Sequence, residues 1–223
     1  MTTTVQVQGK KKVESLPLSK RLRRETKVAH KLVEGTRLAR AFFKGTLNEG
    51  SYAEGLARLY PVYATMESAL SGLPFEHRLK AFDIRNVFRS EAILADLRYF
   101  GVAPEPFRDG ASARYFERVQ AIAGGDPTLL VAHAYVRYMA DVSGGVIAGK
   151  IAQRALKLPT REGLSFLTFA SIPDPAVFRE DFRARLDRFP QSEEEAQAIV
   201  NEASLAFELN RELADELWAE LYR

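Results

Sequence analysis

Residues 129–158 read LLVAHAYVRYMADVSGGVIAGKIAQRALKL and form the longest helical pattern in the chain. Apolar residues recur every three or four positions along this stretch, which predicts one long helix rather than a strand. Ser143, Gly144 and Gly145 interrupt it near the middle, where two glycines cost roughly 2 kcal/mol in helix propensity. A helix that keeps this cost usually bends there or lets another group approach its backbone closely.

The same periodicity runs outward in both directions, and no alternating strand pattern appears. The sequence predicts an all-α fold with helices over residues 18–35, 36–44, 51–72, 83–100, 110–123, 127–157, 175–188 and 192–220. Pro61 should kink the third helix, and Ser192 with Glu195 predicts a capping box ahead of the last one. We expect a single domain over residues 16–223, preceded by a polar, disordered leader over residues 1–15.

The amino-acid composition excludes several classes of protein and of functional site. At 223 residues, 46% hydrophobic and 27% charged, the chain is an ordinary globular protein with room for a core. It has no cysteine, which excludes disulfides, iron–sulfur clusters and cysteine nucleophiles and suits a cytoplasmic location. Residues 1–15 lack the apolar stretch of a signal peptide, and no apolar run approaches the length of a membrane span. The net charge of +3 is too small to indicate nucleic-acid binding by itself.

Three histidines are available as metal ligands. His77 follows Pro74 and Phe75 in a predicted loop, where a surface position is expected, and His133 lies in an apolar stretch typical of a core histidine. His30 lies at the margin of an amphipathic stripe, with Arg23 two helical turns earlier on the same line. That spacing suits a flat ligand that carries both a metal and carboxylates. On spacing alone, however, a purely structural role is the more common one for such a histidine.

The long stretch resembles the distal helix of the heme oxygenase family. The resemblance rests on AHxYxRY at residues 132–138, DxSGG at 141–145 and KIAQ at 150–153. It continues in ETKVAH at 25–30, FxKG at 42–45, LYxxY at 59–63, FxTF at 166–169, FRxxxR at 178–183 and AFxxN at 206–210. These motifs lie in family order over roughly residues 16 to 215.

The resemblance implies a role for each matching residue. His30 would be the proximal ligand of heme b, and Asp141 would hold a distal water network with Tyr63, Arg137 and Asn210. Heme propionates would be bound by Arg23, Tyr135, Arg179 and Arg183. Gly144 and Gly145 would let the distal backbone lie against the heme, and Phe42, Phe166 and Phe207 would form walls. The implied reaction uses O2 and an external reductant to convert heme to biliverdin, CO and ferrous iron, with cleavage expected at the α-meso carbon.

The residue types suit this chemistry. Asp141 lies three and four residues before the glycine pair, so the three share one helical face. A carboxylate working through ordered water can deliver protons, and guanidinium groups bind carboxylates through paired, charge-assisted hydrogen bonds.

The chain departs from the family pattern at Ala140, where glycine is usual, and at Val146, where a polar residue is common. Ala140 motivates an alternative function, a heme-binding sensor or carrier on the same fold without turnover. A helical di-iron oxidase is a weaker alternative, because no Asp or Glu stands three residues before any histidine.

A further alternative is a nucleic-acid or membrane-surface protein that uses a basic helix, formed by Lys20, Arg21, Arg23, Arg24, Lys27 and Lys31. An acidic electron donor, such as ferredoxin or flavodoxin with its reductase, explains this helix equally well. We therefore expect heme and an acidic donor as partners, with no nucleic acid and no membrane.

Overall fold

A computed structural model describes residues 16–104 and 109–222. Within these residues the chain is helical, as predicted: α1 (Leu18–Glu25), α2 (Lys27–Glu34), α3 (Arg37–Lys44), α4 (Glu49–Gly72), α5 (Ser90–Tyr99), α6 (Gly110–Gly124), α7 (Leu130–Ala155), α8 (Pro175–Arg188) and α9 (Glu193–Leu221). Three short 3-10 helices are η1 (Arg78–Phe82), η2 (Arg85–Val87) and η3 (Pro127–Leu129). The predicted leader, residues 1–15, lies outside the described residues.

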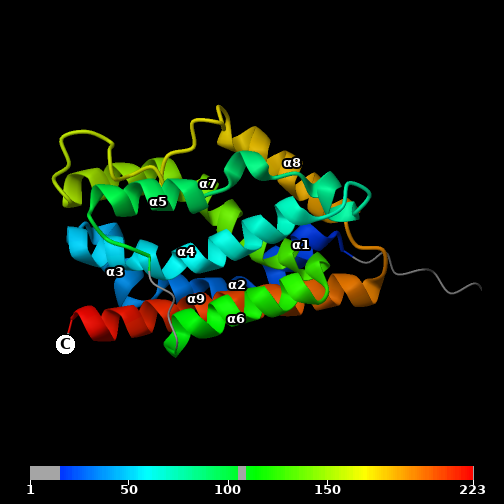
Figure 1. Cartoon of the computed structure of the whole chain (residues 1–223). Helices are drawn as coiled ribbons and strands as arrows, with labels where there is room; N and C mark the ends of the chain where they lie inside the picture. Colours follow the sequence, from blue (N-terminus) through cyan, green and yellow to red (C-terminus); the bar gives the residue numbers. More distant parts are fainter. Residues whose placement is uncertain (1–15, 105–108, 223) are drawn as a thin grey trace, which may run out of the picture.

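The last helix, α9, organises the packing. It runs along one side of the molecule (Figure 1) and packs against α1, α2, α3, α6 and α7. Helix α4 packs against α5 and α6, while α8 packs against α1 and α7. None of the helices in the described residues is long and apolar enough to cross a membrane.

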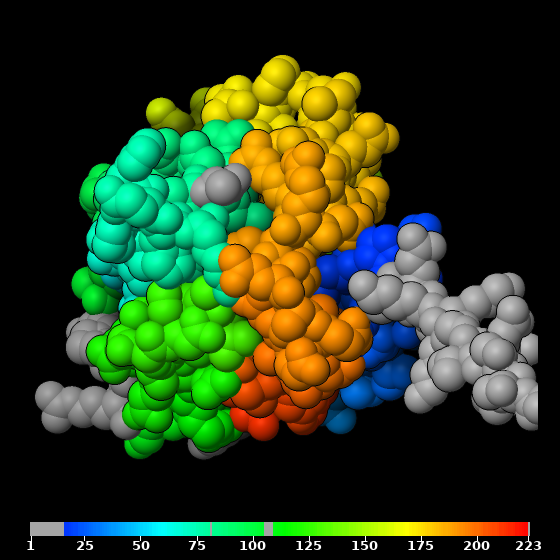
Figure 2. Space-filling model, turned by 90° about the vertical axis from the view of Figure 1, so that its right-hand side faces the viewer, coloured from blue at the N-terminus to red at the C-terminus, as the bar shows by residue number. Residues whose placement is uncertain are grey.

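Two tethers fix the start of α9. Figure 2 shows the α8–α9 junction between the N-terminal helix on one side and the segment around residues 75–90 on the other. Arg21 of α1 pairs with Glu193, and Arg78 of η1 pairs with Glu195 and donates to the Phe189 carbonyl at 3.2 Å. Arg21 is only 5% exposed, so it is not part of the exposed basic helix surface that the sequence suggested.

Three predicted boundaries need correction. The predicted helix over 18–35 is broken at Thr26, whose hydroxyl donates to the Leu22 carbonyl at 2.6 Å. The helix predicted from residue 83 begins only at Ser90, because the Glu67 carboxylate accepts the backbone N–H groups of Arg89 and Ser90 at 2.5 and 3.0 Å. The helix predicted from residue 127 begins with the 3-10 turn η3.

The sequence also predicted three local features of the helices: a kink at Pro61, a bend or close approach at the glycine pair, and a capping box at Ser192. Helix α4 continues unbroken through Pro61, and α7 continues through the glycine pair. Ser192 caps α9 by accepting the Glu195 N–H at 3.1 Å, but the Glu195 carboxylate accepts from Gln191 N at 2.7 Å and from Arg78. Only one of the two hydrogen bonds of the predicted capping box therefore forms, because the Glu195 carboxylate does not accept the Ser192 N–H.

Candidate functional site

Four of the predicted site residues meet in one buried polar cluster. Tyr63 of α4 donates its phenolic hydrogen to Asp141 of α7 and accepts from Arg137 Nε at 2.8 Å. Arg137 also donates to Asn210 of α9, and its guanidinium lies 3.9 Å from the Asp141 carboxylate. The cluster joins three helices that are distant in sequence.

Burial shifts the pKa values of the groups in this cluster. Burial raises the pKa of the Asp141 carboxyl, although Arg137 and the Tyr63 hydrogen bond oppose it. Burial also raises the pKa of Tyr63 well above its usual value, so the phenol keeps its proton near neutral pH. Burial works against the charge of Arg137, but Tyr63 and Asp141 outweigh it and raise the pKa of the guanidinium. Asp141 is therefore a carboxyl group suited to holding and releasing a proton beside a fixed cation.

Four further residues, to which the sequence analysis assigned no role, support the cluster. Glu67 accepts from Tyr138 at 2.9 Å, and Tyr138 packs against Tyr63 with ring centroids 5.8 Å apart. The positive charge of Arg89 lowers the pKa of the Asp141 carboxyl and so opposes the effect of burial. On the other side, Asn210 donates to Tyr115 at 3.2 Å. No sequence signal links these residues, because each lies on a different element.

The two glycines of α7 face different surroundings. A Cβ atom on Gly145 would stand 2.9 Å from the Phe169 ring and 3.3 Å from the Leu167 carbonyl oxygen. A Cβ atom on Gly144 would have no described neighbour within 4 Å. The loop after α7 therefore already occupies the space beside Gly145, and of the pair predicted to lie against heme only Gly144 has open space beside its backbone.

His30 lies on α2 with an accessible imidazole. Its side chain is 48% exposed, its Nδ1 atom lies 3.5 Å from Glu34 Oε2, and its ring meets Phe207 edge-on at 5.5 Å. Glu34 can therefore orient one ring nitrogen and leave the other available to a ligand.

Tyr135, Arg23 and Arg183 converge from α7, α1 and α8. Burial raises the pKa of the Tyr135 phenol, and the interaction with Thr26 and the charges of Arg183 and Arg23 oppose that rise. Arg179 lies one turn before Arg183 on α8, and Arg183 is exposed whereas Arg179 is half-buried. A phenol between cations can bind carboxylates.

The predicted aromatic walls differ in their contacts. Phe166 is buried and packs edge-on against Tyr63 at 5.7 Å, and Phe207 is buried beside His30. Phe42 packs partly against the core and contacts Phe43 at 5.5 Å. Ala140 and Val146 are both exposed on α7.

The other histidines are structural. His133 is fully buried, and its Nε2 atom lies 2.9 Å from Glu202, which Arg118 also contacts. Its Nδ1 atom has no hydrogen-bond partner among the described residues. This histidine belongs to the core, as predicted, but only half of its hydrogen-bonding capacity is used. His77 is half-buried and caps η1 by accepting the Leu79 N–H at 3.2 Å. In residues 16–104 and 109–222, no three His, Cys, Asp or Glu side chains could share a metal ion.

The arrangement fits heme. The exposed imidazole of His30 can take the iron, and the open backbone at Gly144 leaves room for a flat ring. The cations around Tyr135 suit two propionates.

Comparisons with known proteins agree with this fit. The heme oxygenase family profile matches residues 16–216. A heme oxygenase from Guillardia theta is 34% identical over 203 residues, which are 90% of this chain and 86% of that protein. The structure of heme oxygenase from Leptospira interrogans matches with a TM-score of 0.84 and 37% identity, covering 90% of this chain and all of that one. Heme oxygenase-1 from Synechocystis, solved in complex with heme, matches with a TM-score of 0.85 and 32% identity over 92% of this chain and 94% of that one. This chain belongs to the heme oxygenase family.

Proposed function

We propose that this heme oxygenase binds heme b between α2 and α7, with His30 as the only protein ligand of the iron. The observation that carries the proposal is the Tyr63–Asp141–Arg137 cluster, in which Asp141 lies one helical turn before the open backbone of Gly144. Bound heme supplies the chemistry that uses O2 and external electrons and yields biliverdin, CO and ferrous iron.

The distal residues hold and move protons. Asp141 keeps a carboxyl group of raised pKa beside the heme face, and Tyr63 fixes one of its oxygens through a hydrogen bond. Arg137 holds the Tyr63 phenol and the Asn210 amide in place. Ordered water between Asp141 and the heme would carry the protons, and the buried ring of Phe166 packs on Tyr63 and holds it in place.

The propionates would bind at Tyr135, Arg23 and Arg183, with Arg179 as a further cation. Three cations on α1 and α8 beside one phenol would fix the rotation of the macrocycle in its plane. Because these positions match those of α-cleaving members, the α isomer of biliverdin is the expected product.

The electrons would come from an acidic donor, such as ferredoxin or flavodoxin with its reductase. Lys20, Lys27 and Lys31 are exposed along α1 and α2, so they can attract a negatively charged surface. Arg21, which pairs with Glu193, does not contribute. Such soluble donors suit the cytoplasm, where we place this protein.

A heme carrier without turnover remains the second candidate, and Ala140 is the observation that favours it. Ala140 precedes Gly144 by one helical turn, so its methyl group projects on the side where the Gly144 backbone is open. A methyl group there takes space from water above the heme.

An absorbance series on heme-loaded protein in air, with ascorbate or a ferredoxin system, separates the two functions. The enzyme loses the heme band and forms biliverdin and CO, whereas a carrier keeps its heme intact. Chromatography of the biliverdin tests the placement of the propionates, since mainly β or δ isomer would contradict it.

A further inference from the structure

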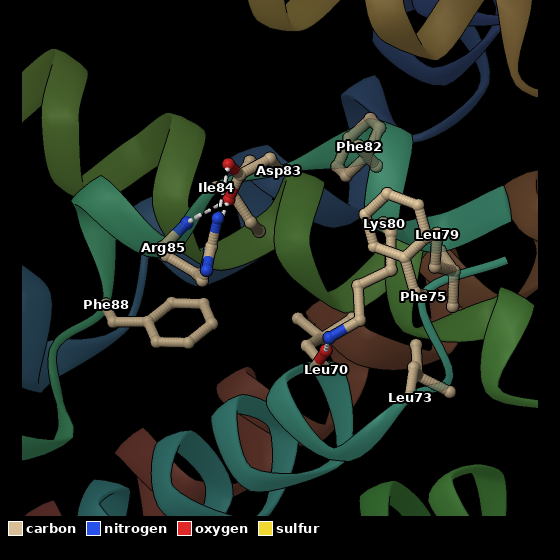
Figure 3. Close-up of a pocket in the computed structure, with 10 residues that line it drawn as sticks. All are labelled: Leu70, Leu73, Phe75, Leu79, Lys80, Phe82, Asp83, Ile84, Arg85 and Phe88. Atoms are coloured by element: carbon tan, nitrogen blue, oxygen red, sulfur yellow. Dashed lines mark hydrogen bonds and ion pairs between the residues drawn. The ribbon is translucent and has the colours of Figure 1, made fainter. Parts of the chain in front are cut away.

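A pocket lies at the end of α4, and neither His30 nor Asp141 is among the residues that line it. It has a volume of about 470 Å³ and is lined by the end of α4, the following turn, η1 and the residues up to Phe88. Figure 3 shows it with Phe88 and Arg85 on one side and Lys80, Leu79 and Phe75 on the other. The volume lies within the range of pockets that bind small molecules.

Seven of the ten residues that line this pocket are apolar, and three of these are buried in the core beneath it. Leu79, Phe82 and Ile84 are each less than 5% exposed, so they form a packed base. Phe88 stacks on Tyr138 with ring centroids 6.3 Å apart and an interplanar angle of 23°. Side chains with this support can bind an apolar body without first reorganising.

The pocket also holds one cation without an acidic partner. Arg85 is neutralised, because both its Nε and Nη2 atoms donate to Asp83, at 2.8 and 3.0 Å, and lower the pKa of that carboxyl to about 2. Lys80 donates to the carbonyls of Leu70 and Ser71 at 3.3 and 2.8 Å, and no carboxylate contacts it within the described part of the chain. An ammonium group has three donors, so one remains for a ligand.

We propose that this pocket binds a small carboxylic acid with an apolar body, such as a medium-chain fatty acid. The apolar body lies against Leu79, Ile84 and Phe88, and the carboxylate accepts the third hydrogen of Lys80. An anion is favoured over a neutral molecule because it provides the counter-charge that Lys80 lacks.

Decanoate is the test ligand. The heme-loaded protein, in its diamagnetic ferrous CO form with labelled Leu and Ile methyl groups, is titrated with decanoate below its micelle concentration. Bound heme keeps decanoate out of the heme site. We expect saturable shifts at Leu73, Leu79 and Ile84, and binding weakened about tenfold or more in Lys80→Met, as for loss of one charge-assisted hydrogen bond.

Three controls make the result decisive. Lys80→Arg keeps the positive charge and should retain most of the binding. That result would show that Lys80→Met weakens binding by removing the charge, and not by removing the hydrogen bonds of Lys80 to the carbonyls at the end of α4. Lys150→Met removes an exposed lysine of α7 and should change nothing, and decanol should bind the parent as weakly as decanoate binds Lys80→Met. Equal decanoate binding in Lys80→Met and the parent, shifts confined to other methyl groups, or no binding would each overturn the proposal.

Discussion

Tyr63 on α4 donates a hydrogen bond to Asp141 on α7, although the two residues are 78 positions apart in the chain. The phenol cannot ionise near neutral pH because burial raises its pKa well above the usual value. It therefore stabilises the charged form of Asp141 and holds one carboxylate oxygen in a fixed direction. Arg137 completes the arrangement by donating to the same phenol oxygen at 2.8 Å.

Asp141→Ala should separate heme binding from turnover. Asp141 is expected to act through water, so heme affinity should stay nearly unchanged while the yield of biliverdin falls and peroxide release rises. Tyr63→Phe, which keeps the carboxylate but removes its hydrogen-bond donor, should have a smaller effect in the same direction. The measurements are heme titration and biliverdin formed per electron consumed. Biliverdin formation at the parent rate in Asp141→Ala would exclude the proposed network.

His30→Ala should abolish the imidazole-ligated heme spectrum, and added imidazole should restore it. The matched variant is His133→Ala. Because His133 is fully buried and bonded to Glu202, this change should lower the free energy of unfolding by roughly 1–3 kcal/mol and keep the spectrum. The reverse result, with the spectrum lost only in His133→Ala, would transfer the ligand role to His133.

Substitution of the neighbouring glycines Gly144 and Gly145 should have opposite effects on stability. Gly145→Ala places a methyl group against the Phe169 ring, which Arg89 covers at 4.1 Å, so overpacking should cost about 1–3 kcal/mol. Gly144→Ala meets no described neighbour and should stabilise the heme-free protein by up to about 1 kcal/mol through helix propensity.

Heme affinity should fall more in Gly144→Ala than in Gly145→Ala. The reason is that the methyl group of Gly144→Ala fills the side of α7 that faces the proposed heme site. Thermal melts without heme and heme titrations of both variants test this pair. A Gly144→Ala protein that binds heme as tightly as the parent would show that α7 does not approach the heme at this position.

Acid should destabilise the protein partly through Glu202. Burial opposes ionisation, but hydrogen bonds from His133 and Arg118 lower the pKa of Glu202 to about 2, below its value in the unfolded chain. The resulting stability is complete above the unfolded pKa, near 4.5, and is lost as the pH falls towards 2. Glu202→Gln should therefore have a flatter dependence of stability on pH between about 4.5 and 2. Denaturant titrations at several pH values measure it, and parallel curves for both proteins would argue against this role.

Sequence periodicity predicted the helical class and most helices, because apolar spacing is a local property of the chain. It failed where a distant side chain decides a boundary, as at Arg89 and Ser90, whose N–H groups are taken by Glu67. The grouping of Tyr63, Arg137, Asp141 and Asn210 came from family resemblance, since no spacing rule joins four residues on three helices. Glu67, Arg89, Tyr115 and Tyr138 were missed for the same reason, and only the packing of the helices shows them.

Ala140→Gly restores the glycine that is usual in the family at this position, and it tests whether the alanine limits heme turnover. Ala140 is exposed and one turn before Gly144, so its methyl group competes with water on the open side of α7. Glycine should lower the free energy of unfolding by about 1 kcal/mol, which is the difference in helix propensity, or roughly 2–4 °C in Tm for a chain of this size. It should also raise the biliverdin formed per electron consumed and leave heme affinity largely unchanged.

The comparison needs one fixed electron donor, because a mismatch between donor and enzyme would hide a change in coupling. Val146→Gln is a useful control, because it places a polar residue at the other position where the chain departs from the family pattern. Val146 is 55% exposed, so this change should leave both stability and coupling near the parent values. If Ala140→Gly couples no better than the parent, the methyl group is accommodated where it stands. The carrier function would then lose the observation that favours it.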